Sequence, residues 1–416
     1  MPVQPSALLM NPINRRKAIA RAIAQSTVLF GGALGASAWA LDTKAADALQ
    51  KEASGQTVYF NAWGGSDVIN RYIQWAGQQV QQRYGVRVEH VKVSDAADVV
   101  KRVRNEKLAG KKDGSVDLVW INGENFLAMK REGLLHGPVN ELLRNYPLVD
   151  VQGKPTTTLD FAEPVDGMEV PWGMAQLTFM VDSQRVPHPP QNIAELLAFA
   201  KANPGRLTYP RPPDFHGTTF LKQLLLDLNT DRTALYQPAT PQTVERMAKP
   251  LWDYLGALHP HLWRAGKQFP QSAAAIRQMM NDGELLFALT FNPNDAANEI
   301  AAQRMAPSVL SYQFSGGTIG NTHFVAIPFN ARAKAGALVF ADFLLSPQAQ
   351  ARKADIAVWG DPTVLALGKL TAADRALFVA KPLPGQVQAS APALSEPHGS
   401  WVDALEAQWI KRYGIS

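Results

Sequence analysis

The chain has 416 residues and contains no cysteine. This absence excludes disulfide bonds, thiolate metal sites, cysteine nucleophiles and a lipid anchor on an N-terminal cysteine. Long apolar runs are also missing after the first forty residues, whereas a membrane-spanning helix needs about twenty predominantly apolar residues. We therefore expect a protein that is not embedded in a membrane.

Recognisable catalytic motifs are absent as well. The sequence has no His-Glu-x-x-His, Gly-x-Ser-x-Gly, Walker or Gly-x-Gly-x-x-Gly motif. The histidines are dispersed, and the closest pair, His259 and His261, has no third ligand nearby in the sequence. We expect no catalytic residue, no metal and no cofactor. A secreted hydrolase that uses carboxylates such as Asp67 and Asp295 remains the alternative, because spacing alone does not reveal such pairs.

The first forty residues differ in character from the rest. Arg15, Arg16 and Lys17 precede a moderately apolar tract that ends in Ala38-Trp39-Ala40. This order is typical of an export signal peptide, so we predict a signal peptide over residues 1–40, cleaved near Ala40. The paired arginines resemble a twin-arginine signal, and both that route and the Sec route stay open. Export without an anchor favours the periplasm.

Net charge is small once this leader is set aside. The formal charge of +5 includes four basic residues of the leader and none of its acids, so residues 41–416 carry about +1. No stripe of lysine or arginine is visible. The composition therefore gives no argument for a nucleic-acid partner, and we expect none.

Two short apolar runs end in tryptophan, glycine and small polar residues. They cover residues 58–62 and 116–121, and each is followed by helical periodicity. Continuous apolar runs of this length are typical of strands buried on both faces, and their alternation with helices predicts an α/β fold. Ligands of such sheets bind beyond the carboxyl ends of the strands, so the following loops are candidate binding loops. The alternative is that they are only capped turns.

A second α/β unit follows a Pro- and Asp-rich stretch over residues 138–166. The patterns predict a strand over residues 176–182, another over 284–290, and a glycine-containing loop over 316–323 that leads into a strand over 324–330. Helices are expected at 192–202, 218–228, 242–258, 272–281 and 294–303. The length and the two units together predict two domains.

Aromatic and polar residues recur where these loops are expected to converge. Flat apolar faces with a few oriented polar groups describe a small-molecule pocket, although core packing is the competing role of each tryptophan. If the solute is a cation, tryptophan faces and carboxylates both attract it. The candidate ligand-binding residues are Trp63, Gly64, Gly65, Ser66, Trp120, Asn122, Glu124, Asn125, Trp172, Tyr209, Asp214, Asn292, Asp295, Asn321, Trp359 and Asp361.

Several segments also resemble a known family. They are Phe60–Gly65, Asp117–Phe126, Pro171–Gln176, Tyr209–Phe215, Gly317–Thr322 and Phe343–Gln350. In this order they resemble the extracellular solute-binding proteins, family 1, of ATP-driven (ABC) importers, and most closely a branch with likeness to thiamine, polyamine and iron transporters.

The resemblance implies the type II periplasmic-binding-protein fold, with two lobes, each a mainly parallel sheet flanked by helices, and a hinge between them. By this likeness the first lobe takes residues 42–170 and 326–365, and the second takes 171–325. Residues 366–416 form a C-terminal helical segment. The implied partners are a small-molecule solute and the permease and ATPase subunits of the transporter, and we expect a monomer.

The ligand class remains a hypothesis at this point. Ferric-ion members of the family use adjacent tyrosines, and this sequence has no Tyr-Tyr pair. An organic cation or a thiamine-like compound is the leading candidate, and a sugar is the next. A soluble sensor that presents its ligand to a receptor is a further alternative to an importer component.

Overall fold

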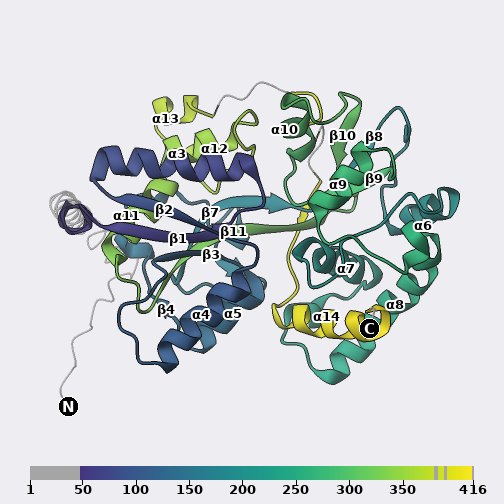
Figure 1. Cartoon of the computed structure of the whole chain (residues 1–416), viewed down its shortest axis with the longest axis horizontal. Helices are drawn as coiled ribbons and strands as arrows, with labels where there is room; N and C mark the ends of the chain where they lie inside the picture. The colour runs from purple at the N-terminus through teal and green to yellow at the C-terminus, as the bar shows by residue number, and fades with distance from the viewer. Residues whose placement is uncertain (1–46, 379–382, 388–390, 415–416) are drawn as a thin grey trace, which may run out of the picture.

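The computed structural model describes residues 47–378, 383–387 and 391–414. The predicted signal peptide, residues 1–40, lies outside these residues. In the described part of the chain, no helix is both long and apolar enough to cross a membrane. Figure 1 shows two lobes side by side, with the purple and blue N-terminal elements in one and most of the teal and green elements in the other.

The first lobe contains a seven-stranded mixed sheet with the main strand order β12-β11-β3-β1-β2. β1 pairs in parallel with β2 and with β3, which confirms the strands and helices predicted for this part. β11 runs antiparallel to β3, and β4 and β7 also pair with β11. The strands are β1 (Thr57–Trp63), β2 (Arg87–Val93), β3 (Leu118–Ile121), β4 (Leu135–His136), β7 (Glu169–Gln176), β11 (Thr318–Pro328) and β12 (Ala393–Leu394).

Helices cover both faces of this sheet. On one face, α3 and α11 share a core with β1, and on the other face α4 and α5 pack against β3. α3 buries Ile69, Tyr72, Ile73 and Val80, which is the stripe of spacing three and four that the sequence shows. The helices of this lobe are α3 (Asp67–Tyr84), α4 (Ala96–Leu108), α5 (Gly123–Arg131), α11 (Lys334–Leu344), α12 (Pro347–Ala354) and α13 (Ala372–Ala376).

The second lobe corrects the prediction of a mainly parallel sheet. Its three-stranded sheet has the order β10-β8-β9, and both neighbours of β8 run antiparallel to it. The apolar pattern that identified these strands does not encode their direction, because it only reports burial. The elements are β8 (Thr178–Asp182), α6 (Ile193–Ala202), α7 (Phe215–Leu228), α8 (Pro241–Leu258), α9 (Ala273–Asn281), β9 (Phe287–Thr290), α10 (Asp295–Ala301), β10 (Val309–Tyr312) and α14 (Ser400–Tyr413).

Two strands cross between the lobes. β7 and β11 pair antiparallel from Gly320↔Gln176 to Ala326↔Glu169, and Figure 1 shows both running from one lobe toward the other. The predicted loop over residues 316–323 is therefore wrong from Thr318 onward, because β11 begins at that residue. Gly320 and Asn321 look like loop residues in the sequence, but the ladder with β7 pairs them with Gln176 and Ala175.

The C-terminal segment contacts both lobes. Trp401, Leu405 and Trp409 of α14 belong to the core of the second lobe, whereas Leu370 and Phe378 pack on the core of the first. Between the lobes, a small hairpin of β5 (Leu159–Asp160) and β6 (Glu163–Pro164) precedes β7. The exact lobe boundaries given above remain predictions.

A buried ion pair lies directly against the crossing strand β7. Lys353 Nζ lies 2.5 Å from Asp361 Oδ2, and both side chains are almost completely buried. A Cβ atom on Gly173 would overlap this carboxylate and this ammonium group. The sequence therefore needs glycine at this position of the strand.

We predict that Gly173→Ala lowers the free energy of unfolding by about 3–5 kcal/mol, because it separates or displaces a buried ion pair. Urea denaturation monitored by tryptophan fluorescence measures this change. Gly256→Ala is the control, because nothing lies within 4 Å of a Cβ at this position of α8, and it should leave the stability unchanged or raise it by up to about 1 kcal/mol. Equal stability of Gly173→Ala and the parent chain would contradict the prediction.

Candidate functional site

Four of the predicted residues meet at the crossing strands. Trp120 at the end of β3 lies with its ring 5.0 Å from Trp172 of β7 and 6.2 Å from Trp359, and Trp172 lies 5.4 Å from Trp359. Asp361 completes the group. We call Trp120, Trp172, Trp359, His323 and Asp361 the aromatic cluster.

Burial separates the members of the aromatic cluster. Trp172, Trp359 and Asp361 are buried, so they serve the packing of the hinge, while Trp120 is only partly buried. His323 of β11, which the sequence analysis did not select, stacks on Trp359 and lies 3.2 Å from Asp361 Oδ1. Trp120 and His323 are therefore the members of the aromatic cluster whose side chains are partly exposed.

A second lysine–carboxylate pair lies farther along β11. Lys222 Nζ of α7 lies 2.7 Å from Glu396 Oε2, and both side chains are almost completely buried. Asn321 Nδ2 donates to Glu396 Oε1 at 3.2 Å. Since alternate residues of a strand point to the same face, Asn321 and His323 place the two ion pairs along one face of β11.

Carboxylates outnumber lysine around this second pair. Glu124 in the first turn of α5, Asp160 of the hairpin, and Glu406 of α14 all interact electrostatically with Lys222. With Glu396 they form what we call the acidic cluster. It spans the two lobes, because α5 and the hairpin lie in the first lobe and α7 and α14 pack in the second.

Burial raises the pKa of these carboxyl groups. The pKa of Glu124 is raised to about 7, chiefly by desolvation; a backbone hydrogen bond and Lys222 oppose the shift, and Glu406 and Asp403 add to it. Desolvation also raises the pKa of Glu406 to about 7, although a hydrogen bond from Thr218 lowers it. The pKa of Asp160 is raised by its complete burial, despite the bond that its Oδ2 accepts from the N–H of Gly123 at 2.6 Å.

The loop after β1 faces the second lobe. Trp63 is 38% exposed, and Gly65 lies under its indole ring. The neighbouring Asp67 contributes to raising the pKa of Arg304, whose main partner is Glu299. Residues Trp63 to Ser66 therefore lie where the first lobe approaches the second.

The start of α10 contacts the first lobe. Asn294 Nδ2 donates to the carbonyl of Gly360 at 2.5 Å, which holds the predicted residues Trp359 and Asp361 against this helix. Asn292 donates to Asn298, and Asp295 binds Arg277 through both oxygens at 2.8 and 2.9 Å. These two predicted residues are thus near the lobe junction but already have partners.

The remaining predicted residues have separate roles. Asn122 Nδ2 donates to the carbonyl of Thr322 and so ties the end of β3 to β11. Asn125 donates to Glu124, and Asp214 caps α7 by accepting from His216 and Gly217. These contacts account for the three side chains without a solute.

The structure corrects the prediction that Tyr209 binds the ligand. Its ring is fully buried in the core of the second lobe, where its hydroxyl group contacts His259 Nε2 and accepts a hydrogen bond from Trp409 Nε1, both at 2.8 Å. Both polar needs of the hydroxyl group are met inside the core. The segment Tyr209–Phe215 was recognisable in the sequence, but the sequence did not show which way the Tyr209 side chain points.

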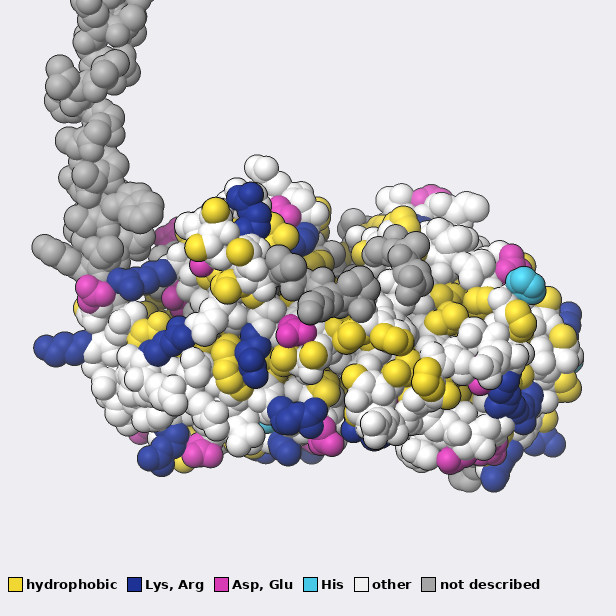
Figure 2. Space-filling model, turned by 90° about the horizontal axis from the view of Figure 1, so that it is seen from above, with side chains coloured by type: hydrophobic (Ala, Val, Ile, Leu, Met, Phe, Trp, Pro, Cys, Tyr) yellow, Lys and Arg dark blue, Asp and Glu magenta, His cyan; other side chains and the backbone are white. Residues whose placement is uncertain are grey.

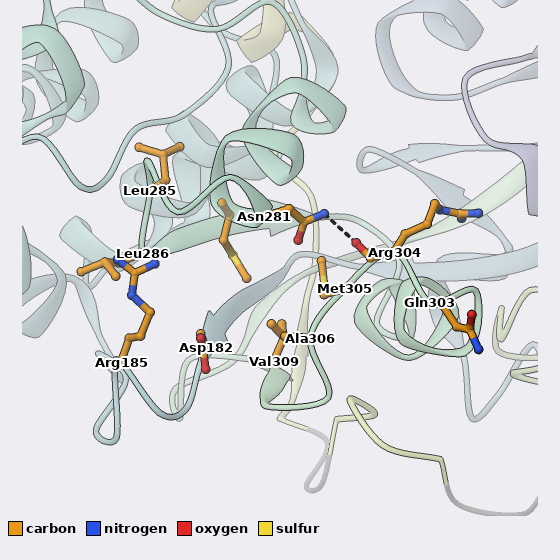
Figure 3. Close-up of a pocket in the computed structure, with 11 residues that line it drawn as sticks. Asp182, Arg185, Asn281, Leu285, Leu286, Gln303, Arg304, Met305, Ala306 and Val309 are labelled. Carbon is orange, nitrogen blue, oxygen red and sulfur yellow. Dashed lines mark hydrogen bonds between the residues drawn. The ribbon is translucent and has the colours of Figure 1, made fainter.

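Two cavities in the described part of the chain bear on the location of the site. The first, of about 400 Å³, lies in the second lobe between the ends of β8 and β10 and the helix α9 (Figure 3). It contains none of the predicted residues. The second, of about 380 Å³, lies between the hairpin, Tyr236 of the second lobe, and Asn321 and Glu396. The second cavity is therefore the one that adjoins the acidic cluster.

The distribution of basic side chains and of possible metal ligands limits the chemistry of the site. On the face shown in Figure 2, lysine and arginine side chains are scattered over both lobes and do not form a single patch. Among the described residues, no group of three or more histidine, aspartate or glutamate side chains is arranged to hold a metal ion. The arrangement suits the binding of an organic molecule by aromatic faces and carboxylates.

Comparisons with known proteins agree with this architecture. The profile of the family described as bacterial extracellular solute-binding protein matches residues 75–377. Protein YnjB of Escherichia coli (strain K12) is 49% identical over 381 residues, which cover 91% of this chain and 97% of that protein. The likeness therefore extends over nearly the whole sequence.

Solved structures show the same fold at low sequence identity. The periplasmic binding protein AfuA from Actinobacillus pleuropneumoniae, with exogenous fructose-6-phosphate bound, has a TM-score of 0.60 and 16% identity, covering 87% of this chain and all of that one. The spermidine/putrescine binding protein PotD from Streptococcus pneumoniae has a TM-score of 0.58 and 14% identity, covering 86% and 100%. These matches confirm the predicted two-lobed type II fold.

The raised pKa values of Glu124 and Glu406 predict a stability that falls with pH. Between their ordinary pKa near 4.5 and about 7, the folded chain holds protons that the unfolded chain has released. The free energy of unfolding should therefore decrease as the pH rises from 5 to 8, by about 1–3 kcal/mol for each group. Urea denaturation at several pH values measures the slope.

Glu124→Gln should flatten this slope, because it removes one of the two titrating groups. The matched control is Glu141→Gln, since Glu141 is exposed in a short 3₁₀ helix and is not a member of the acidic cluster. A slope that Glu124→Gln leaves unchanged would contradict the assignment.

Proposed function

Because this chain belongs to the bacterial extracellular solute-binding proteins, which act with ABC transporters, we propose that it captures an organic cation between its lobes and delivers it to a membrane permease. The lobes close on the solute, and the closed form docks on the permease, whose ATPase subunits drive import. Its compartment is the periplasm, and it acts as a monomer without a cofactor.

The acidic cluster carries the proposal for a cation. Glu396 pairs with Lys222 at 2.7 Å, and Glu124, Asp160 and Glu406 interact electrostatically with the same ammonium group. Burial, with a smaller contribution from neighbouring carboxylates, raises the pKa of Glu124, Asp160 and Glu406, so they hold protons that a bound cation can replace. A phosphate or sulfate would meet repulsion here and would find only one lysine.

Aromatic faces at the same junction support an organic cation. Trp63 is 38% exposed and Phe215 at the start of α7 is 41% exposed, while Trp120 is partly buried. Exposed faces of large aromatic side chains attract ammonium groups and pack against apolar parts of a solute. A sugar also stacks on tryptophan, but it gains nothing from the surrounding carboxylates.

The names of the relatives differ in ligand chemistry. AfuA is described with fructose-6-phosphate, and PotD is described as a spermidine/putrescine binding protein. Their identity to this chain is too low to transfer either ligand. The charge of the acidic cluster is closer to what a polyamine needs than to what a sugar phosphate needs.

The contacts of Asp295 speak against the hydrolase alternative. Both of its oxygens are engaged by Arg277, so it is not poised to donate or accept a proton from a solute. This observation supports a protein that binds its solute without covalent chemistry.

Isothermal titration calorimetry on refolded, solute-free protein tests the ligand class. The panel contains thiamine, polyamines, aromatic amines, sugars and sugar phosphates at pH 8 and pH 5.5. We expect heat only with cations, and an affinity that falls by up to about a hundredfold for each pH unit below 7, because the cation needs both Glu124 and Glu406 ionised. Binding of only neutral or anionic compounds would contradict the proposal that the solute is a cation.

Trp63→Ala and Trp120→Ala should each weaken binding of the cation found by this panel by about 1–3 kcal/mol. Both side chains present part of an aromatic face at the lobe junction. Trp263→Ala is the control, because its indole group lies in the second lobe and donates to Glu284. Unchanged affinity in both variants would show that Trp63 and Trp120 do not contribute to solute binding.

A further inference from the structure

The second cavity, beside Asn321, has one polar end and one apolar wall. Phe161, Leu159, Ala162, Pro155 and Tyr236 supply most of the wall, and Asn321 and Glu396 form the polar end. Phe161 and Asn321 are buried, whereas Leu159 is 41% exposed. The cavity therefore opens near Leu159 and ends at Asn321. Its volume of about 380 Å³ lies in the range of small-molecule pockets.

The polar end contains an acceptor without a partner. Asn321 Nδ2 donates to Glu396, but the buried Oδ1 of Asn321 has no hydrogen-bond partner among the described residues. A buried carbonyl oxygen without a partner is energetically unfavourable, so a bound N–H donor would relieve it. Lys222 occupies the other oxygen of Glu396, and its ammonium group lies 4.1 Å from the centre of the Phe161 ring.

The apolar wall is held in place by a constrained hairpin. Phe161 and Ala162 form the turn between β5 and β6, and both have positive φ values, 43° and 64°. The Phe161 ring packs so closely on Gly123 that a Cβ atom on Gly123 would lie 2.6 Å from the ring. The backbone carbonyl of Phe161 accepts a hydrogen bond from the N–H of Gly399 at 3.2 Å. The wall is thus preformed on the first lobe, and Tyr236 adds to it from the second.

We propose that the solute is an ammonium compound with an apolar or aromatic arm, whose arm fills this cavity while an N–H group donates to Asn321 Oδ1. This inference rests on the proposed function and narrows its ligand class. A linear polyamine needs a carboxylate at each end, but the wall from Pro155 to Ala162 supplies none toward the opening. Glu396 is the carboxylate that lines the cavity, beside Asn321 at its polar end, so a single cationic head fits there.

Calorimetry with 2-phenylethylammonium, putrescine and neutral 2-phenylethanol tests the proposal. We expect 2-phenylethylammonium to bind at least about tenfold more tightly than either of the others. Tyr236→Ala should weaken it by about tenfold and leave any binding of putrescine unchanged. Ala162→Leu should also weaken binding of 2-phenylethylammonium, because the larger side chain narrows the cavity. This second variant keeps the test valid if loss of the Tyr236 side chain perturbs folding.

Met280→Ala is the matched control, because Met280 lines the other cavity, and this variant should bind all three compounds as the parent chain does. Equal affinity for 2-phenylethylammonium and putrescine would contradict the proposal that the solute has an apolar arm. The same holds if neither Tyr236→Ala nor Ala162→Leu changes the affinity. Both results would leave the proposal of a cationic solute intact. Binding of 2-phenylethanol as tight as that of the ammonium compound would overturn the cationic head. Failure of every cation in the panel would instead overturn the proposed function.

Discussion

The antiparallel pairing of β7 with β11 is the constraint on which the rest of the molecule depends. These strands are paired from Gly320↔Gln176 to Ala326↔Glu169, and β11 also joins β3 in the first lobe and β12 of the C-terminal segment. Backbone hydrogen bonds fix the register, which shifts once between His323 and Phe324, so the side chains of β11 up to His323 alternate between two faces. The position of Asn321 and His323 at the junction follows directly from this ladder.

Two buried lysine–carboxylate pairs are built onto that ladder. Lys353–Asp361 lies against Gly173, and Lys222–Glu396 lies beside Asn321. Such pairs add little net stability, because desolvation offsets their attraction, but an unpaired member would be strongly unfavourable. They therefore specify how the loop before Asp361, the C-terminal segment and α7 meet the crossing strands. The carboxyl groups around Lys222 are the basis of the proposal that the solute is a cation.

Much of the architecture was predictable from local patterns. The strand–helix order of the first lobe follows from buried apolar runs and helical stripes such as that of α3, which require only spacing along the chain. The pattern failed where direction or pairing mattered. The second sheet is antiparallel, and Thr318 to Thr322 is strand despite its loop-like glycine and asparagine.

The sequence by itself determined the α/β composition, the two-unit organisation, the family resemblance and the aromatic and acidic character of the loops. Only the tertiary structure decided which of those residues meet. It joined Trp120 to Trp172 and Trp359, placed Tyr209 in a core, and brought Phe161, Lys222 and Glu396 to Asn321. The physical reason is that burial and periodicity are local properties, whereas a site is formed by side chains that register and packing bring together from distant segments.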